Sequence, residues 1–483
     1  MIEARTELRV PSPGAARSFW LQEALAAEPG ERCPPLDANV VADVCIVGGG
    51  FAGLWTAIEL TARRPGIRIV MLEQDIVGGG ASGRNGGFFS SSWWDLPGLC
   101  GLFGRAEGLR YARVLANAVP EADRFVADHG LDCDFHAEGA LAARTGAWQG
   151  DILDDEAVRL CMELGEADRL RPLSGPDARA VADSPRFVGG AFAPDNAITQ
   201  PAKLARGLRR LLLERGVRIH ERTRVRDVDR SRPAIVRADR GAVRAPQVVL
   251  ANGSWAAASR EFRRSFGVIA DYMVVTEPIP ELLREIGWTS SIGIADGRDL
   301  LYYLRPTDDG RIAIGGGATG VVYGGRASGR AATHDRRIAE VAAGGLLWLF
   351  PQLEGVRFTH AWGGPIDHTS AFVPFFRTLP PGNVHAGLGF SGHGLSQTFV
   401  GGRILASKVL GVHDEWSSLP VARPEIGKAP PEPLRWPAVR MAAWALERGD
   451  AREDAGRRRG LALGWIGNAP LRYRRFLMRR GGT

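Results

Sequence analysis

The sequence predicts an α/β protein with a Rossmann-type domain and a second domain built on a mixed, largely antiparallel sheet. A strand–helix–strand unit near the start of the chain indicates the first domain, because it has the usual length of such a unit. Short strands and turns over 267–317 indicate the second, because they are typical of antiparallel pairing. A length of 483 residues also favours two domains over a single core.

The strand–helix–strand unit consists of an apolar strand over 42–47, a helix over 52–63 and a second apolar strand over 67–73. Continuous apolar runs of this kind are expected of strands that are buried on both faces. A loop rich in glycine and serine follows over 78–87. The unit therefore predicts the centre of a parallel sheet with a helix packed against it.

The later elements are assigned by the same criteria. Most of 111–183 is predicted to be helical, and Gly216 is predicted to end the helix that precedes it. Helices are predicted over 202–215, 335–350 and 392–410, and strands over 139–144, 217–222, 225–228, 247–251 and 384–389.

These elements divide the chain into two domains and a tail. The Rossmann-type domain is predicted to be discontinuous, with residues 37–98, 190–258 and 358–412. The second domain is predicted to comprise 99–189 and 259–357. Residues 413–483 are predicted to form a basic, helical C-terminal tail. The simplest interpretation of this tail is a pair of surface helices, and a membrane-surface or oligomerisation role is the alternative.

Composition and charge exclude several classes of protein. The apolar fraction of 45% and the charged fraction of 24% are those of a soluble globular protein. The net charge is +7, but arginines are spread along the chain and cluster only near its end, so no nucleic-acid partner is predicted. The five cysteines include no CxxC pair, and we expect neither a metal site nor a disulfide framework. Without a signal peptide or a long apolar run, we expect no transmembrane segment and a cytoplasmic location.

A glycine motif stands between the first strand and its helix. Gly48 permits a tight turn, Gly50 lets the backbone approach a pyrophosphate, and Gly53 allows close packing of helix on strand. The helix begins at Phe51 and Ala52, where free N–H groups and the helix dipole favour phosphate. The motif therefore predicts dinucleotide binding.

Glu73 at the end of the following strand supports the same prediction. A carboxylate at this distance from the glycine motif accepts the ribose hydroxyls of an adenine dinucleotide. It would also repel the additional phosphate of NADP. These residues alone leave FAD and NAD open.

The loop that follows Glu73 favours FAD over NAD, because it resembles a loop of a known flavoprotein family. Residues 80–87, with the sequence GASGRNGG, resemble the loop after the ribose-binding acid in the D-amino acid oxidase family, especially its gamma-glutamylputrescine oxidase and sarcosine-oxidase-like branch. In that family the loop wraps the pyrophosphate and leads to the isoalloxazine ring. The resemblance implies FAD on a glutathione-reductase-like domain, with contacts from Ser82, Arg84, Asn85 and Gly86.

Three more segments match the family in the same order. Val225 stands where the family holds adenine through the backbone, and residues 251–255 resemble a turn that passes under the cofactor. Residues 387–395 resemble the final loop, whose N–H groups and helix N-terminus would stabilise the anionic reduced flavin. The cofactor-binding residues implied by the last two segments are Ala251, Gly253, Trp255, Gly392, His393, Gly394 and Leu395.

Departures from the family pattern bear on the chemistry. Relatives attach flavin covalently through a cysteine near 362–364 or a histidine near the pyrophosphate loop. This chain has no cysteine after Cys161 and no histidine before residue 129, so we expect non-covalent FAD. Several oxidases of the family have a lysine near flavin N5 that assists oxygen, whereas 311–317 contains none. The electron acceptor is therefore left open between oxygen and an electron carrier.

Candidate substrate residues lie in the second domain and in the final loop. Tyr302 and Tyr303 are predicted to lie on opposite faces of one strand, so that one of them points towards the flavin. Tyr302 is taken as the catalytic candidate, with Arg305 as a clamp for an anionic group and His393 as a polar contact.

The predicted activity is FAD-dependent oxidation of the C–N bond of a small amine or amino acid. Hydride transfer to flavin N5 would give an imine that hydrolyses. The alternatives are a flavin monooxygenase that uses NAD(P)H and a non-catalytic FAD-binding scaffold protein. The identity of the amine and the oligomeric state are left open.

Overall fold

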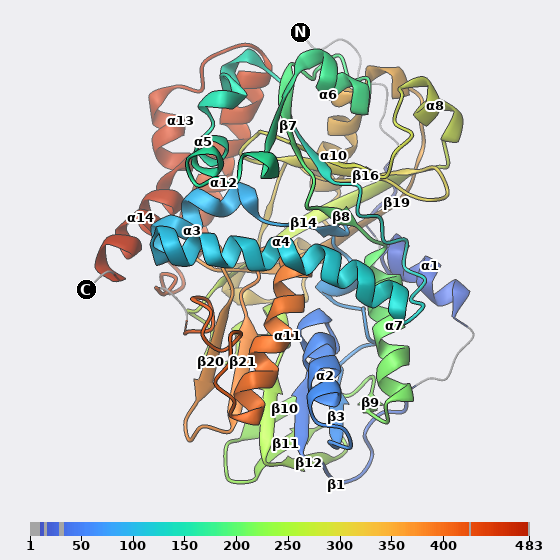
Figure 1. Cartoon of the computed structure of the whole chain (residues 1–483), viewed down its shortest axis with the longest axis vertical. Helices are drawn as coiled ribbons and strands as arrows, with labels where there is room; N and C mark the ends of the chain where they lie inside the picture. Colours follow the sequence, from blue (N-terminus) through green and yellow to red (C-terminus); the bar gives the residue numbers. More distant parts are fainter. Residues whose placement is uncertain (1–9, 14–16, 29–32, 425–426, 482–483) are drawn as a thin grey trace.

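Two large sheets organise the chain, and helices pack on and between them (Figure 1). The computed structural model describes residues 10–13, 17–28, 33–424 and 427–481. The helices in the first half of the chain are α1 (Phe19–Ala27), α2 (Phe51–Arg63), α3 (Leu96–Phe103), α4 (Arg105–Asp128), α5 (Glu156–Glu163), α6 (Gly175–Val181) and α7 (Pro201–Glu214). Those that follow are α8 (Pro280–Glu285), α9 (Arg330–Thr333), α10 (Arg336–Leu349) and α11 (Gly394–Leu410).

The first large sheet has the Rossmann-type arrangement that the sequence predicts. Its strand order is β20 (Phe375–Leu379), β21 (Val384–Leu388), β13 (Gln247–Leu250), β2 (Val44–Val47), β3 (Ile69–Leu72) and β9 (Arg218–His220). All neighbours are parallel except the β20–β21 pair. Every residue of β2 and β3 is buried, because α2, α7 and α11 cover one face of these strands and the other face packs in a core that includes residues 234–245. Figure 1 shows α2 and α11 side by side in front of it.

A smaller sheet crosses the lower end of this domain in Figure 1. Its order is β1 (Val40–Val41), β12 (Ala242–Ala245), β11 (Ala234–Ala238) and β10 (Val225–Asp229). A two-stranded pair, β4 (Phe88–Phe89) with β8 (Ala197–Ile198), continues from the loop at 80–87.

The second large sheet is mixed and largely antiparallel, which confirms the predicted fold class. Its order is β18 (Gly320–Val321), β14 (Gly267–Thr276), β17 (Ile312–Gly316), β16 (Tyr302–Pro306), β15 (Gly293–Asp296), β5 (Ala140–Arg144), β7 (Gly189–Ala193) and β6 (Arg171–Ser174), with β19 (Phe358–His368) paired to β14. Among the described pairings, β5 and β15 run parallel and the others antiparallel. Helix α10 packs on β14 and β17.

The strand pairings depart from the predicted domain boundaries at two places. The prediction assigns 358–412 to the Rossmann-type domain, but β19 pairs with β14 along almost its whole length. It also starts a Rossmann-type segment at 190, whereas β7 pairs with β5 and β6 of the second sheet. Apolar strands pair equally well in either sheet, so the pattern alone could not assign β7 and β19.

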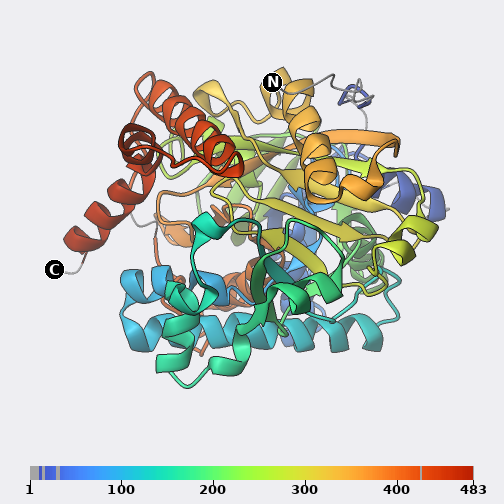
Figure 2. The ribbon, with the colours of Figure 1, turned by 90° about the horizontal axis from the view of Figure 1, so that it is seen from above.

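The C-terminal tail is helical, as predicted, and lies along one side of the molecule (Figure 2). It comprises α12 (Arg435–Asp454), α13 (Leu461–Gly467) and α14 (Ala469–Gly481). The Arg435 side chain donates a hydrogen bond to the Arg263 carbonyl at 2.9 Å, and Asp454 pairs with Arg298 at 2.6 Å. The tail is thus joined to the second sheet. In the described ranges, the helices lack the combination of length and apolarity that a membrane crossing requires.

Candidate active site

Close backbone packing shapes the glycine turn between β2 and α2. Gly48 has a φ of +112°, and a Cβ placed on it would overlap the Ala251 carbonyl. A Cβ on Gly53 would overlap the carbonyl of Gly48. These two glycines therefore let β13 and α2 approach the turn, as predicted for the tight turn and for helix packing.

The N-terminus of α2 opens into a cavity of about 740 Å³, whose lining includes Gly50, Phe51 and Ala52. The N-cap residue is Gly50, which offers no capping side chain. Ser82 Oγ accepts the Phe51 N–H at 2.9 Å and lies 3.0 Å from where a Cβ on Gly50 would stand. A helix N-terminus of this kind, close to a glycine and a serine hydroxyl, fits a pyrophosphate.

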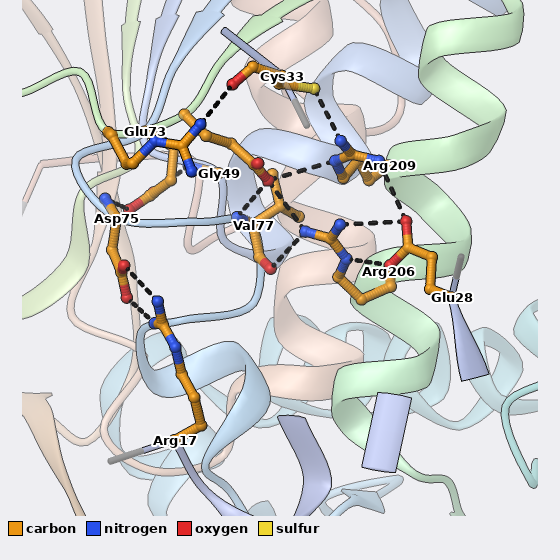
Figure 3. A network of polar contacts seen from close by, with 11 residues as sticks. Arg17, Glu28, Cys33, Gly49, Glu73, Asp75, Val77, Arg206 and Arg209 are labelled. Carbon is orange, nitrogen blue, oxygen red and sulfur yellow. Dashed lines mark hydrogen bonds and ion pairs between the residues drawn. The ribbon is translucent and has the colours of Figure 1, made fainter. Parts of the chain in front are cut away.

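Glu73 lies beside this turn (Figure 3). Its two carboxylate oxygens accept the N–H groups of Gly49 and Asp75, both at 2.8 Å. Burial raises the pKa of Glu73 to about 7. The Thr223 N–H donates to the Glu73 carbonyl at 2.8 Å, so β3 is joined to the segment that leads into β10. The predicted ribose-binding acid thus stands at the end of β3 facing the glycine turn.

A buried ion network supports the chain after Glu73 (Figure 3). Glu221 accepts hydrogen bonds from Val77 N at 3.0 Å, Arg206 Nη1 at 2.9 Å and Arg209 Nε at 3.2 Å. Both arginines also pair with Glu28, which follows α1. The sequence analysis did not identify this network. Its signal was a pair of arginines at i and i+3 on the otherwise apolar face of α7.

The loop over 80–87 is held by tryptophans from distant segments. Trp362 Nε1 donates to the Arg84 carbonyl at 2.8 Å, and Trp20 Nε1 donates to the Asn85 carbonyl at 3.0 Å. The Arg84 guanidinium donates to the carbonyls of Gly79 at 3.0 Å and Gly363 at 3.1 Å. The loop geometry is therefore set before any ligand contact.

The side chains of this loop have a different arrangement from the predicted one. Arg84 and Asn85 were expected to offer donors to the cofactor. Both line the cavity, but the Asn85 amide donates to Ala81 and Ser82 carbonyls at 3.0 and 3.1 Å. Burial lowers the pKa of Arg84. In the structure the Asn85 amide bonds within the loop, and the Arg84 guanidinium joins the loop to β19.

The cavity brings together most of the predicted cofactor residues. Those that line it are Gly50, Phe51, Ala52, Ser82, Arg84, Asn85, Gly86, Ala251, Gly253, Gly392, His393, Gly394 and Leu395. Gly48, Gly53, Glu73, Val225 and Trp255 are not among its lining residues. The Trp255 ring packs behind the loop, 3.5 Å from where a Cβ on Gly80 would stand. Val225 lies in the small sheet, where it pairs with Ala238.

The final loop leads directly into α11 at the cavity wall. Ser391 and Gly392 have φ values of +53° and +89°, and α11 starts after His393, which makes no side-chain cap. Asp367 of β19 holds this loop, because its Oδ2 accepts the Gly389 N–H at 2.6 Å. Burial raises the pKa of Asp367 to about 6. A second uncapped helix N-terminus therefore faces the same cavity.

One of the two tyrosines of β16 faces the cavity, as expected, but it is Tyr303 and not the candidate Tyr302. Tyr302 packs in the core, with the Arg298 guanidinium 4.1 Å from its ring centroid, and is not among the lining residues. Tyr303 lines the cavity, and its hydroxyl donates to Asp271 Oδ2 at 2.7 Å. Side chains alternate along a strand, so only one of the two can face the cavity.

Arg305 is not a clamp in this structure, which corrects the prediction. It is fully buried, it lies 5.3 Å from the Trp20 ring, and it donates to the carbonyls of Thr199 and Pro306. Burial lowers its pKa to about 10. Although it follows Tyr303 by two residues, Trp20 and the chain at Thr199 cover it. Arg305 therefore lies on the same face of β16 as Tyr303, but Trp20 and the chain at Thr199 separate it from the cavity.

Acidic residues of the second sheet complete the cavity wall, and sequence reasoning missed them. Asp271 on β14, Asp296 on β15 and Asp367 on β19 all line it. Burial raises the pKa of Asp271 to about 6 and that of Asp296 to about 7. An aspartate inside an apolar strand such as β14 is unusual, and that could have identified Asp271.

The far end of the cavity adjoins the C-terminal tail. Arg298 lies in the lining, 3.4 Å from Asp296 and 2.6 Å from Asp454 of α12. Asp450, one turn earlier on α12, accepts the Leu300 N–H at 2.9 Å. The tail therefore supports the turn between β15 and β16 that closes this end.

Comparison with known proteins finds one family of oxidoreductases by sequence and by fold. Residues 43–408 match the family model DAO, described as FAD dependent oxidoreductase. Gamma-glutamylputrescine oxidoreductase of Escherichia coli (strain K12) is 28% identical over 383 residues, which cover 78% of this chain and 85% of that protein. A probable oxidoreductase OrdL of Haemophilus influenzae is 26% identical over 391 residues, with the same two coverages. The crystal structure of glycine oxidase from Geobacillus kaustophilus shares the fold, with a TM-score of 0.65 and 19% identity over 80% of this chain and 98% of that one.

Proposed function

Because the chain belongs to the FAD dependent oxidoreductase family, we propose that it oxidises the C–N bond of a small amine or amino acid. FAD is the cofactor of this family, and when bound it supplies an acceptor for a hydride. The observation that carries the proposal is one cavity that joins the glycine turn to a separate wall of acidic and aromatic side chains. The relatives that match most of the chain include an oxidoreductase named for an amine, which supports this class of substrate.

In this proposal the cofactor end of the cavity binds FAD. The N–H groups at the start of α2 and the Ser82 hydroxyl hold the pyrophosphate, and Glu73 accepts the ribose hydroxyls. The final loop at 392–395 and the start of α11 line the cavity and would hold the ring of the flavin, where the positive helix end would stabilise negative charge. None of the five cysteines is among the lining residues, which supports non-covalent binding.

The substrate end holds the carbon next to nitrogen against the ring. Loss of a hydride from that carbon of the neutral amine, and of a proton from its nitrogen, leaves an imine, which water hydrolyses to a carbonyl compound and an amine or ammonia. Positioning contributes most to such a step, because the donor carbon and the hydride acceptor must be held in contact. Tyr303 and Asp271 on one wall and His393 on another are the polar groups proposed to position the substrate.

The electron acceptor is oxygen or a carrier. The three lysines are Lys203, Lys408 and Lys428, and none of them is among the residues that line the cavity. Lys203 pairs with Asp134 at 2.9 Å. The absence of a lysine from the cavity wall favours slow reaction with oxygen.

Anaerobic reduction of the purified, FAD-loaded protein tests the function. A panel of polyamine derivatives, N-methyl amino acids, D-amino acids and aminophosphonates is mixed with the protein while the flavin absorbance is followed. We expect one class to bleach the flavin, and admission of air then separates oxidase from dehydrogenase. Bleaching by NADPH without any amine, or by no compound of the panel, would contradict the proposal.

A further inference from the structure

Asp271 is a partly buried carboxylate on the cavity wall, and in the described part of the chain no ion pair joins it to a basic side chain. Its two oxygens accept the Tyr303 hydroxyl and the Tyr272 N–H, both at 2.7 Å. Burial raises its pKa, and no basic side chain acts in the opposite direction. Buried charges in proteins are normally paired, because an isolated charge is costly to remove from water.

The arginines of the same cavity already have partners. Arg84 donates to two backbone carbonyls, Arg144 lies 3.2 Å from Asp155, and Arg298 lies 2.6 Å from Asp454. Asp367 also faces the cavity, but it accepts the Gly389 N–H and holds the final loop. Among the described residues Asp367 likewise has no basic partner, so Asp271 differs from it in two respects: it lies beside Tyr303, and its carboxylate does not hold the final loop. A cationic ligand at Asp271 would supply the pairing that the protein does not.

Tyr303 holds Asp271 in the cavity wall at the substrate end, beside the loop over 80–87. Its ring lies between two glycines, so that a Cβ on Gly86 would stand 2.7 Å from Tyr303 Cε2 and one on Gly315 would overlap its hydroxyl. Gly86 belongs to the loop over 80–87, which follows β3 and Glu73 in the chain. The Phe88 ring packs edge-on against Tyr303 at 5.9 Å. Three neighbours thus fix the tyrosine hydroxyl on Asp271.

We propose that Asp271, oriented by Tyr303, binds the cationic group of the substrate, so that the enzyme selects cationic amines over compounds that place a carboxylate at this position. The inference rests on the proposed function for the identity of the ligand as substrate. Recognition of a cation by this pair is nevertheless measurable without turnover.

A matched pair of probes tests the recognition. tert-Butylammonium has no hydrogen on the carbon bonded to nitrogen, so it cannot lose a hydride, and pivalate has a similar shape with the opposite charge. Calorimetric titration of the FAD-loaded full chain measures both affinities. We expect tert-butylammonium to bind at least about 10-fold more tightly than pivalate, since hydrogen bonds to charged groups contribute most. Equal affinities, or tighter binding of pivalate, would overturn the proposal.

Variants connect the preference to the two side chains. Asp271→Asn should weaken tert-butylammonium about 10- to 100-fold without weakening pivalate, and Asp271→Glu should restore part of the loss. Tyr303→Phe should weaken the cation about 3- to 10-fold. Tyr302→Phe, on the opposite face of the strand, is the matched control and should change neither affinity. Unchanged binding of tert-butylammonium by Asp271→Asn contradicts the proposal.

The pH dependence provides a test on the wild-type protein, which remains available if a variant does not load FAD. The pKa of Asp271 is raised to about 6, so the carboxylate gains its charge as pH rises through this value. The affinity for tert-butylammonium, which stays cationic throughout, should therefore increase as pH rises past about 6. Asp367 and Asp296 on the same wall also gain charge near this pH, so the part of the increase due to Asp271 is the part that Asp271→Asn loses. An affinity that stays constant across this range contradicts the assignment.

The two proposals fail separately. If tert-butylammonium binds as expected while no amine bleaches the flavin, the proposed function fails and the cation site stands. If an amine bleaches the flavin but Asp271→Asn binds the cation as tightly as the wild type, the cation site fails and the proposed function stands.

Discussion

At the cofactor end of the cavity the wall is largely backbone, whereas at the substrate end it is largely side chains. The glycine turn, the start of α2 and the loop over 80–87 present N–H groups and closely packed glycines. The substrate end gathers Asp271, Tyr303 and Asp296 from separate strands, with α12 behind them. A backbone wall tolerates few substitutions because space is lacking, while a side-chain wall can change its chemistry without changing the fold.

The largest effect is expected at the glycine turn. Gly48→Ala adds a Cβ that overlaps the Ala251 carbonyl and requires a positive φ, so the free energy of unfolding should fall by about 3–5 kcal/mol. Gly66→Ala is the control, because Gly66 also has a positive φ but nothing lies within 4 Å of the added atom. Its cost should be about 1–2 kcal/mol. Denaturant unfolding measures both, and equal losses would mean that crowding at the turn has no effect.

The second-largest effect is expected on the rate constant of flavin reduction, and it should differ between the two faces of β16. Tyr303→Phe removes the hydroxyl that donates to Asp271, and the rate constant of anaerobic flavin reduction should fall about 10-fold. Tyr302→Phe should leave that rate constant unchanged, because its hydroxyl points at the Val341 carbonyl 3.4 Å away, outside the cavity. Stopped-flow absorbance measures both variants. A larger loss for Tyr302→Phe would reverse the assignment of the two faces.

A smaller effect is expected at the ribose-binding acid. Glu73→Gln keeps the shape but removes the charge, so the dissociation constant of FAD should rise about 10-fold. In the wild type the pKa of Glu73 is raised to about 7, so the carboxyl takes up a proton as pH falls through this value. Affinity for FAD should therefore decrease below about pH 7, and this dependence should be absent from Glu73→Gln. Fluorescence titration with FAD at several pH values shows whether the two curves differ.

The smallest effect is expected where the tail meets the second sheet. Asp454→Asn weakens the pair with Arg298, and the free energy of unfolding should fall by about 1–2 kcal/mol while FAD content stays the same. Glu281→Gln, in the exposed pair with Arg284, should have no measurable effect. Thermal unfolding measures both. Loss of FAD from Asp454→Asn would show that the tail acts on the cofactor end as well.

Sequence reasoning was most successful where the site is contiguous. Thirteen predicted cofactor residues line the cavity because the glycine turn, the loop over 80–87 and the final loop each act through neighbouring residues. It was less successful for Tyr302 and Arg305. The alternation of a strand indicates that two faces exist, but the packing of Trp20 and of the second sheet decides which face is open.

The sequence by itself determined the Rossmann-type unit, the glycine turn with its acid at Glu73, and the family to which the chain belongs. These depend on local backbone geometry and on short spacings, which the order of residues specifies directly. Only the tertiary structure decided that β7 and β19 join the second sheet, that Tyr303 rather than Tyr302 faces the cavity, and that Asp271 has no basic partner there. Those features arise from contacts between residues far apart in the chain, whose burial and charge balance exist only once the sheets are packed.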